Sequence, residues 1–189
     1  MSGSLILLDR DGVLNRVVVD PEHGTIDSPL HPDQVDVFPW VPDALLRLQR
    51  AGFALAVVSN QPAASKRKTT RENLQRVHAR VLREAEKAGA RIASSHICFH
   101  RAEDGCRCRK PGTALLEEAF AKNPLADRSN SWMVGDGVTD VEAGARLSLR
   151  TAFLGPRKCE ACRILQERNL SPTLWAADLA EVADVLTAR

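Results

Sequence analysis

Residues 5–12 read Leu-Ile-Leu-Leu-Asp-Arg-Asp-Gly, an apolar run that ends in two carboxylates and a glycine. A short, continuous apolar run is typical of a strand buried on both faces of a parallel sheet. Ligands bind at the carboxyl ends of such strands in open α/β folds. Because positions i and i+2 of an extended chain lie on the same side, Asp9 and Asp11 are predicted to face one ligand, while Gly12 lets the backbone turn away.

A second apolar run, residues 132–134, leads into Gly-Asp-Gly-Val-Thr-Asp over residues 135–140. Hydrolysis of a phosphate ester needs one carboxylate that attacks phosphorus and a second that moves a proton. It also needs a cation, and Mg²⁺ prefers an oxygen-rich pocket with one or two carboxylates. We therefore predict that Asp136 completes a magnesium site. Alone, Asp-x-Asp-Gly also fits a surface turn or part of a calcium loop, so the other motifs decide.

The motifs resemble those of phosphatases of the haloacid dehalogenase superfamily, in the same order along the chain. These are Asp-x-Asp-Gly, a Ser after a second apolar run at residues 53–58, a Lys, and Gly-Asp-x-x-x-Asp. The resemblance implies that Asp9 is the nucleophile and Asp11 the general acid and base. It also implies that Mg²⁺ is held by Asp9, Asp136 and the backbone carbonyl of Asp11.

The resemblance assigns further roles around the phosphate. Ser59 and Asn60 would donate hydrogen bonds to phosphoryl oxygens, and Gln61 would help to bind the substrate. Lys110 would neutralise charge in the transition state, and Asp140 would orient either metal-bound water or Lys110. Taken alone, Ser59 would be read as a turn residue at the end of a strand.

Two cysteine-rich pairs lie immediately before Lys110, separated by five residues, 101–105. The set consists of Cys98, His100, Cys106 and Cys108. Three thiolates and one imidazole match a closed, tetrahedral structural zinc site. We expect Zn²⁺ to hold the loop 98–108 rigid so that Arg109 and Lys110 are presented correctly. The alternative is that these four residues are unrelated.

Together the motifs resemble one branch of the superfamily, which contains heptose bisphosphate phosphatases and histidinol-phosphate phosphatases. Arg109, carried over from that branch, would bind the rest of the substrate. A small phosphorylated sugar is the expected partner, with heptose 1,7-bisphosphate favoured because Arg109 and the basic residues 66–68 could hold a second phosphate. Histidinol phosphate is the alternative, with Glu103 or Asp104 available to its amine. Residues 62–68 depart from the branch, so the distal end of the substrate is expected to be held differently. Residues 16–30 also depart from it, and no substrate contact is assigned to them.

The composition fits a single domain spanning residues 1–189, with 44% hydrophobic and 26% charged residues. A net charge of +2 gives no electrostatic footprint for nucleic acid. No stretch is long and apolar enough for a membrane span or a signal peptide. We expect a cytoplasmic monomer. The rival class is a non-catalytic, zinc-stabilised binding module. Cys159 and Cys162 are read as one face of a helix rather than as a redox pair.

Strand and helix patterns alternate along the chain, which predicts a three-layer α/β fold with a Rossmann-like parallel sheet, the haloacid dehalogenase fold. No insertion is long enough for a large cap domain, so the site should be open apart from the zinc loop. Strands are expected at residues 5–8, 53–58, 97–99, 132–134 and 151–154. Helices are expected at residues 42–51, 70–89, 113–121, 141–147 and 159–168, with a last one from Asp178.

Overall fold

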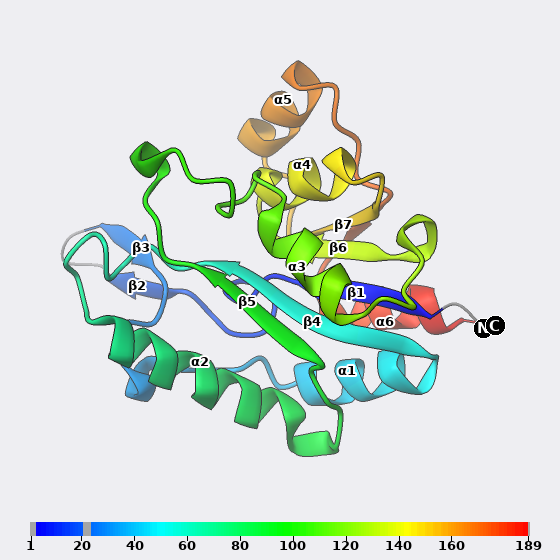
Figure 1. The fold of residues 1–189 in the computed structure, drawn as a ribbon, viewed down its shortest axis with the longest axis horizontal. Helices are drawn as coiled ribbons and strands as arrows, with labels where there is room; N and C mark the ends of the chain where they lie inside the picture. The colour runs from blue at the N-terminus through cyan, green and yellow to red at the C-terminus, as the bar shows by residue number, and fades with distance from the viewer. Residues whose placement is uncertain (1–2, 21–23, 189) are drawn as a thin grey trace.

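The computed structural model of the chain describes residues 3–20 and 24–188. Its centre is a six-stranded sheet in the order β5-β4-β1-β6-β7-β8, in which every neighbouring pair is parallel (Figure 1). The strands are β1 (Ser4–Leu8), β4 (Phe53–Asn60), β5 (Ser94–Cys98), β6 (Trp132–Gly135), β7 (Arg150–Leu154) and β8 (Leu174–Ala176). The predicted parallel α/β sheet is confirmed.

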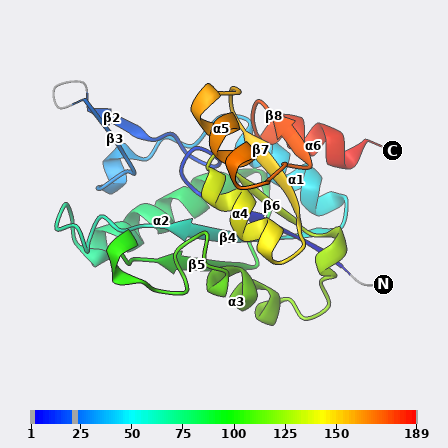
Figure 2. The same cartoon turned by 90° about the horizontal axis from the view of Figure 1, so that it is seen from above.

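Helices cover both faces of this sheet. The helices are α1 (Val41–Arg50), α2 (Arg71–Ala85), α3 (Ala114–Lys122), α4 (Val138–Arg146), α5 (Cys159–Glu167) and α6 (Leu179–Thr187). Helices α1, α2 and α6 lie on one face and α3, α4 and α5 on the other (Figures 1 and 2). Short 3₁₀ turns occur at η1 (Pro32–Gln34), η2 (Glu86–Ala88), η3 (Ala102–Asp104) and η4 (Arg128–Asn130).

Strand β1 is the core of the sheet because its side chains enter both apolar layers. Ile6 and Leu8 pack with α1 and α6, whereas Leu5 and Leu7 pack with α3. All four side chains are fully buried. Residues 5–8 therefore pack into an apolar layer on each face of the sheet, which is why apolar and polar residues do not alternate in this run.

Three local expectations needed correction. Helix α4 begins at Val138, not at residue 141, because Gly137 ends the extended chain and Asp140 accepts a hydrogen bond from the Gly137 backbone N–H at the first turn. Strand β8 was not expected. Residues 16–30 contain an antiparallel hairpin of β2 (Val18–Asp20) and β3 (Thr25–Asp27). Within the described residues this hairpin is the insertion after the first motif, and no cap domain is present.

None of the helices in the described part of the chain combines the length and apolar character needed to cross a membrane.

Helix α4 approaches the sheet closely at Gly144. A Cβ at this position would lie 2.6 Å from Cγ2 of Thr151 and 2.9 Å from Cβ of Met133. We expect Gly144→Ala to destabilise the protein by about 1–2 kcal/mol, because the overpacking cost exceeds the gain in helix propensity. Urea unfolding measures the change. Gly3→Ala is the matched control, since a Cβ there meets open space. Equal stability of the two variants would contradict the close approach.

Candidate active site

The functional side chains gather at the carboxyl edge of the three central strands. Asp9 follows β1, Ser59 lies near the end of β4, and Asp136 follows β6. Because β4, β1 and β6 are adjacent and parallel, these three ends meet at one edge. Residues from three separate sequence motifs are therefore brought together by strand order alone.

Three carboxylates form a cluster at this edge. One oxygen from each of Asp9, Asp136 and Asp140 lies within 4.8 Å of the others. Burial, followed by the charges of Asp9 and Asp140, raises the pKa of Asp136 to about 7. Gly12 permits the approach of Asp136, because a Cβ at Gly12 would lie 2.0 Å from its Oδ2. Asp136 is a carboxylate without sufficient positive charge around it, and its oxygens suit a hard divalent cation.

Lys110 is the buried cation of the site, with 2% of its surface exposed. Its Nζ lies 2.6 Å from Oδ1 of Asp140 and 3.0 Å from Oδ1 of Asp9, and it donates a hydrogen bond to the Val58 carbonyl. Burial lowers the pKa of Lys110, but Asp140 and Asp9 raise it more, so the pKa lies above its usual value. The side chain therefore stays charged, and its ammonium group faces Asp9, the predicted nucleophile.

Asn60 reaches the site through the backbone of Lys110. Its Oδ1 accepts a hydrogen bond of 3.0 Å from the Lys110 N–H, and its Nδ2 donates one of 3.1 Å to the Lys110 carbonyl. Both polar ends of the amide are thus used to hold the residue that carries the ammonium. Its predicted contact with a phosphoryl oxygen stays a prediction.

Asp11 is surrounded by donors. Its Oδ1 accepts from Arg10 Nε and Asn15 Nδ2, and its Oδ2 accepts from Arg10 Nη2 and Gln61 Nε2, at distances of 2.6 to 3.1 Å. Burial raises the pKa of Asp11, but the charge of Arg10 and these hydrogen bonds lower it more, so it lies below its usual value. The sequence analysis missed Arg10 and Asn15, although Arg10 stands between the two aspartates of the first motif.

Gln61 and Ser59 are both buried behind the site, each 1% exposed. Gln61 Nε2 donates to Oδ2 of Asp11 and to Oγ of Ser59, while Gln61 Oε1 accepts from Arg10 Nη2. The structure therefore joins Gln61 to protein groups on every side. A direct contact between Gln61 and the substrate, as the sequence analysis expects, stays a prediction.

The four expected zinc ligands converge. The sulfur–sulfur distances among Cys98, Cys106 and Cys108 are 3.2 to 3.7 Å, and His100 Nδ1 lies 3.2 Å from Sγ of Cys108. Around a tetrahedral zinc ion with bonds of about 2.3 Å to sulfur, the ligand atoms lie farther from one another than from the metal, at separations close to those seen here. The set therefore fits the metal. The Arg109 backbone N–H also points at Sγ of Cys106, at 3.4 Å, and its side chain donates to the His100 carbonyl. The cluster thus adjoins the two basic residues that follow it.

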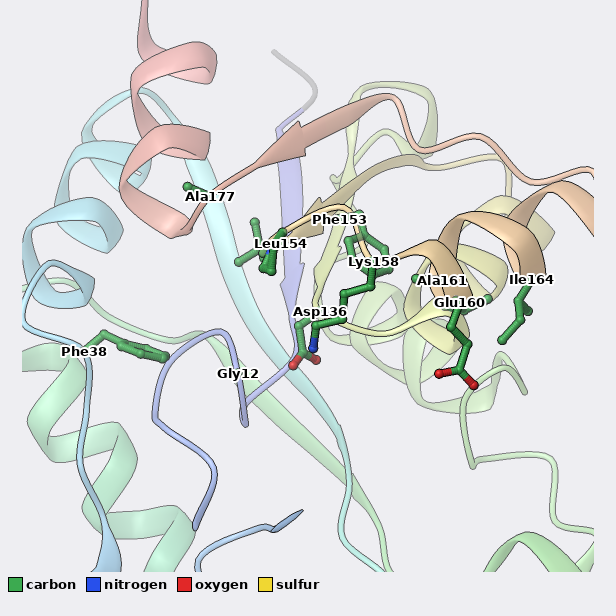
Figure 3. Close-up of a pocket in the computed structure, with 13 residues that line it drawn as sticks. Gly12, Phe38, Asp136, Phe153, Leu154, Lys158, Glu160, Ala161, Ile164 and Ala177 are labelled. Carbon is green, nitrogen blue, oxygen red and sulfur yellow. The ribbon is translucent and has the colours of Figure 1, made fainter. Parts of the chain in front are cut away.

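Beside Asp136 the surface opens into a pocket of about 400 Å³ (Figure 3). Its lining includes Gly12 after β1, Phe38 before α1, Leu154 at the end of β7 and Ile164 of α5. Lys158 and Glu160 add charged groups on the α5 side. Apart from Gly12, these residues lie outside the recognised motifs, and the sequence analysis assigned none of them to the site.

A parallel sheet with a buried lysine between aspartates at its carboxyl edge defines a phosphatase of the haloacid dehalogenase (HAD) type. A family described as HAD-hydrolase-like matches residues 107–182. A D-glycero-beta-D-manno-heptose-1,7-bisphosphate 7-phosphatase of Pseudomonas aeruginosa is 31% identical over 191 residues, covering 98% of this chain and 99% of that protein. The chain belongs to the HAD-like hydrolases, in the branch of the D,D-heptose 1,7-bisphosphate phosphatases and the HisB phosphatases, and is a phosphomonoester hydrolase.

Other relatives agree with this placement. The D,D-heptose 1,7-bisphosphate phosphatase of B. bronchiseptica, crystallised with magnesium and phosphate, superimposes with a TM-score of 0.78 at 26% identity, covering 97% of each chain. The histidine biosynthesis bifunctional protein HisB of Campylobacter jejuni is 31% identical over 153 residues, which is 79% of this chain but 41% of that protein. The expected family is confirmed.

The buried lysine gives a stability prediction. Lys110→Met should lower the free energy of unfolding by about 3–5 kcal/mol, because it leaves Asp140 buried without its counter-charge. The double variant Lys110→Met with Asp140→Asn should recover much of that loss. Urea unfolding at pH 7.5 measures both.

Lys87→Met is the matched control, because Lys87 pairs with Glu84 on the surface and its loss should leave stability unchanged. If Lys110→Met lowered the free energy of unfolding no more than the control does, the buried ion pair would not be what stabilises this edge of the sheet.

Proposed function

We propose that the enzyme removes the C7 phosphate of D-glycero-D-manno-heptose 1,7-bisphosphate, with Mg²⁺ as cofactor and an aspartyl-phosphate intermediate. The observation that carries the chemistry is the Lys110 ammonium held between Asp9 and Asp140, beside the open carboxylate of Asp136. The observation that favours the substrate is likeness over the full length to a heptose bisphosphate phosphatase.

The residues present fit Mg²⁺. Asp136 has a pKa raised by burial and by neighbouring carboxylates, which is the environment a divalent cation relieves. Asp9, Asp136 and the backbone carbonyl of Asp11 would hold the ion, while Asp140 is engaged by Lys110 and acts on that side chain. When bound, Mg²⁺ would neutralise the charge of the phosphate so that an anionic nucleophile can approach it.

The proposed mechanism has two steps. A carboxylate oxygen of Asp9 attacks phosphorus in line, and the bond from phosphorus to the substrate oxygen breaks. The leaving oxygen takes a proton from Asp11, which enters this step in its carboxylic acid form and leaves it as the ionised carboxylate that Arg10, Asn15 and Gln61 stabilise. Water then attacks the phosphoryl group on Asp9 and loses a proton to Asp11, which releases phosphate and restores both side chains. Lys110 and the Ser59 hydroxyl stabilise charge on the phosphoryl oxygens.

Arg109 is proposed to bind the distal part of the substrate, since it lies beside Lys110 and its side chain is tied to the zinc loop at the His100 carbonyl. The basic residues 66–68 give weaker support than the sequence analysis assumed, because Lys68 pairs with Asp27 of the hairpin. A phosphate bound by this loop would therefore meet Lys66 and Arg67 rather than all three residues.

Histidinol phosphate is the second candidate, favoured by the likeness to HisB proteins. Its amine would need an acidic partner near the zinc loop. Asp104 is already engaged, because its carboxylate accepts hydrogen bonds from the Arg101 backbone and side chain. Glu103 is then the remaining expected partner, which makes this substrate the weaker proposal. A monomeric state, a cytoplasmic location and the absence of nucleic-acid binding remain predictions from sequence.

Phosphate release with Mg²⁺ tests the proposal. We expect kcat/KM to be higher for one anomer of heptose 1,7-bisphosphate than for histidinol phosphate or a simple hexose phosphate. Asp9→Asn is the control: it should lose at least about a thousandfold in kcat because it removes the nucleophile, with an unchanged melting temperature. Preference for histidinol phosphate would replace the proposed substrate, and an active Asp9→Asn enzyme would remove the proposed nucleophile.

We further propose that Zn²⁺ occupies the cluster of Cys98, His100, Cys106 and Cys108. Burial raises the pKa of the Cys98 thiol to about 12 in the absence of metal, so binding must displace its proton. Cys108→Ser should lower zinc content, melting temperature and turnover together, because the loop then loses the ion that orders it.

Cys162→Ser makes the same atomic change outside the cluster and should retain one zinc per chain. Zinc is measured by elemental analysis and stability by thermal unfolding. A melting temperature that stays constant after verified removal of zinc would argue against a structural role for the ion.

A further inference from the structure

Gln61 is the junction of the buried hydrogen-bond network behind the site. Its Nε2 lies 2.6 Å from Oδ2 of Asp11 and 3.0 Å from Oγ of Ser59, and its Oε1 lies 2.7 Å from Nη2 of Arg10. The side chain is buried, so these three protein groups use both of its amide hydrogens and its carbonyl oxygen. A direct role toward substrate would require breaking one of these bonds.

Arg10 determines which way the amide of Gln61 points. A guanidinium has no acceptor, and an ionised carboxylate has no donor. Rotating the amide by half a turn would place its NH₂ against Nη2 of Arg10 and its carbonyl against the carboxylate of Asp11, and both contacts would be repulsive. Arg10 is fully buried and bound to Asp11 through two nitrogens, so this orientation is rigid.

The orientation of Gln61 has a consequence for the Ser59 hydroxyl. A hydroxyl carries one hydrogen and two acceptor lone pairs. Because Oγ of Ser59 accepts from Gln61, its single hydrogen remains available for another acceptor. In the proposed mechanism that acceptor is a phosphoryl oxygen, so Gln61 prepares the hydroxyl to donate.

The same amide also fixes Asp11. The carboxylate of Asp11 receives four hydrogen bonds, two on each oxygen, and Gln61 makes the shortest of them. A proton donor must be held in a defined direction toward the leaving oxygen to be effective. Gln61 therefore contacts both a group that would bind the phosphoryl oxygens and the group that would protonate the leaving oxygen.

We propose that Gln61 is a positioning residue, not a substrate contact: oriented by Arg10, it couples the Ser59 hydroxyl to the Asp11 carboxylate. The inference rests on the roles of Ser59 and Asp11 in the proposed function. Through Ser59 it acts on every phosphate ester, whereas through Asp11 it acts only on esters whose leaving group needs a proton.

The dependence on the leaving group tests the coupling. Gln61→Met keeps the size of the side chain and removes its donors and its acceptor. We expect kcat to fall about 10- to 100-fold for an alkyl phosphate and at least about fivefold less for 4-nitrophenyl phosphate, whose leaving anion needs no proton. KM should change by less than about threefold, because Gln61 does not touch the substrate.

Gln49→Met is the matched control, since the Gln49 amide also bonds a neighbouring segment, at Arg91, but lies on α1 away from the site. It should leave both substrates unaffected. An equal loss of kcat on alkyl and aryl phosphates would indicate a merely structural role, and a raised KM with unchanged kcat would indicate a substrate contact. Either result would overturn the proposal.

Gln61→Glu provides a second variant if the methionine enzyme fails to fold. It keeps the acceptor for Arg10 and the length of the side chain but no longer donates to Asp11 and Ser59, so the same selective loss on alkyl phosphates is expected. The comparison uses the alkyl phosphate that the unmodified enzyme hydrolyses best. Failure of the heptose assignment would show in the unmodified enzyme, whereas failure of the coupling would show only in the variants.

Discussion

The buried ammonium of Lys110 is the interaction on which the active edge of the sheet depends. Lys110 lies between Asp9, which follows β1, and Asp140, in the first turn of helix α4 after the neighbouring strand β6. Removing the ammonium from such a buried set leaves Asp140 without its counter-charge, which is far more costly than losing a surface pair. The surroundings of Lys110 hold it in place: Asn60 bonds both the N–H and the carbonyl of Lys110. The cysteine cluster lies just before it, and the Arg109 N–H points at Sγ of Cys106.

The same edge holds carboxylates in opposed environments. Asp11 is supplied with donors by Arg10, Asn15 and Gln61, which hold its pKa below the usual value. Asp136 has burial and two like charges around it, which raise its pKa to about 7. Carboxylates placed in such different surroundings can take different roles, one in proton transfer and one toward a cation. Within the described residues, the only buried arginine, Arg10, lies beside Asp11, and the only buried lysine, Lys110, lies against Asp9 and Asp140.

The sequence predicted the parallel sheet and the three strands that lead to the site, because apolar runs followed at once by polar motifs are strong local signals. It also picked out the four cysteine and histidine side chains that the structure brings together, and their role as zinc ligands stays a prediction. It did not predict the hairpin of β2 and β3 or strand β8, which are three residues long and have no clear period. Nor did it show that Asn60 and Gln61 face protein groups. Their orientation depends on Lys110 and Arg10, which are 50 and 51 residues away along the chain, and only the folded chain sets those partners opposite them.

The loops beside the active edge are held together differently from its buried centre. The hairpin, the loop 62–68 and the zinc loop come from distant parts of the chain and lie at one end of the molecule (Figures 1 and 2). They are joined by single contacts: Lys68 to Asp27, Ser65 to the Phe99 carbonyl, and Arg71 over the Phe99 ring. Exposed contacts of this kind are each weak, so this wall can change without disturbing the buried lysine and its carboxylates. Loops joined in this way allow substrate contacts to vary while the buried site stays the same.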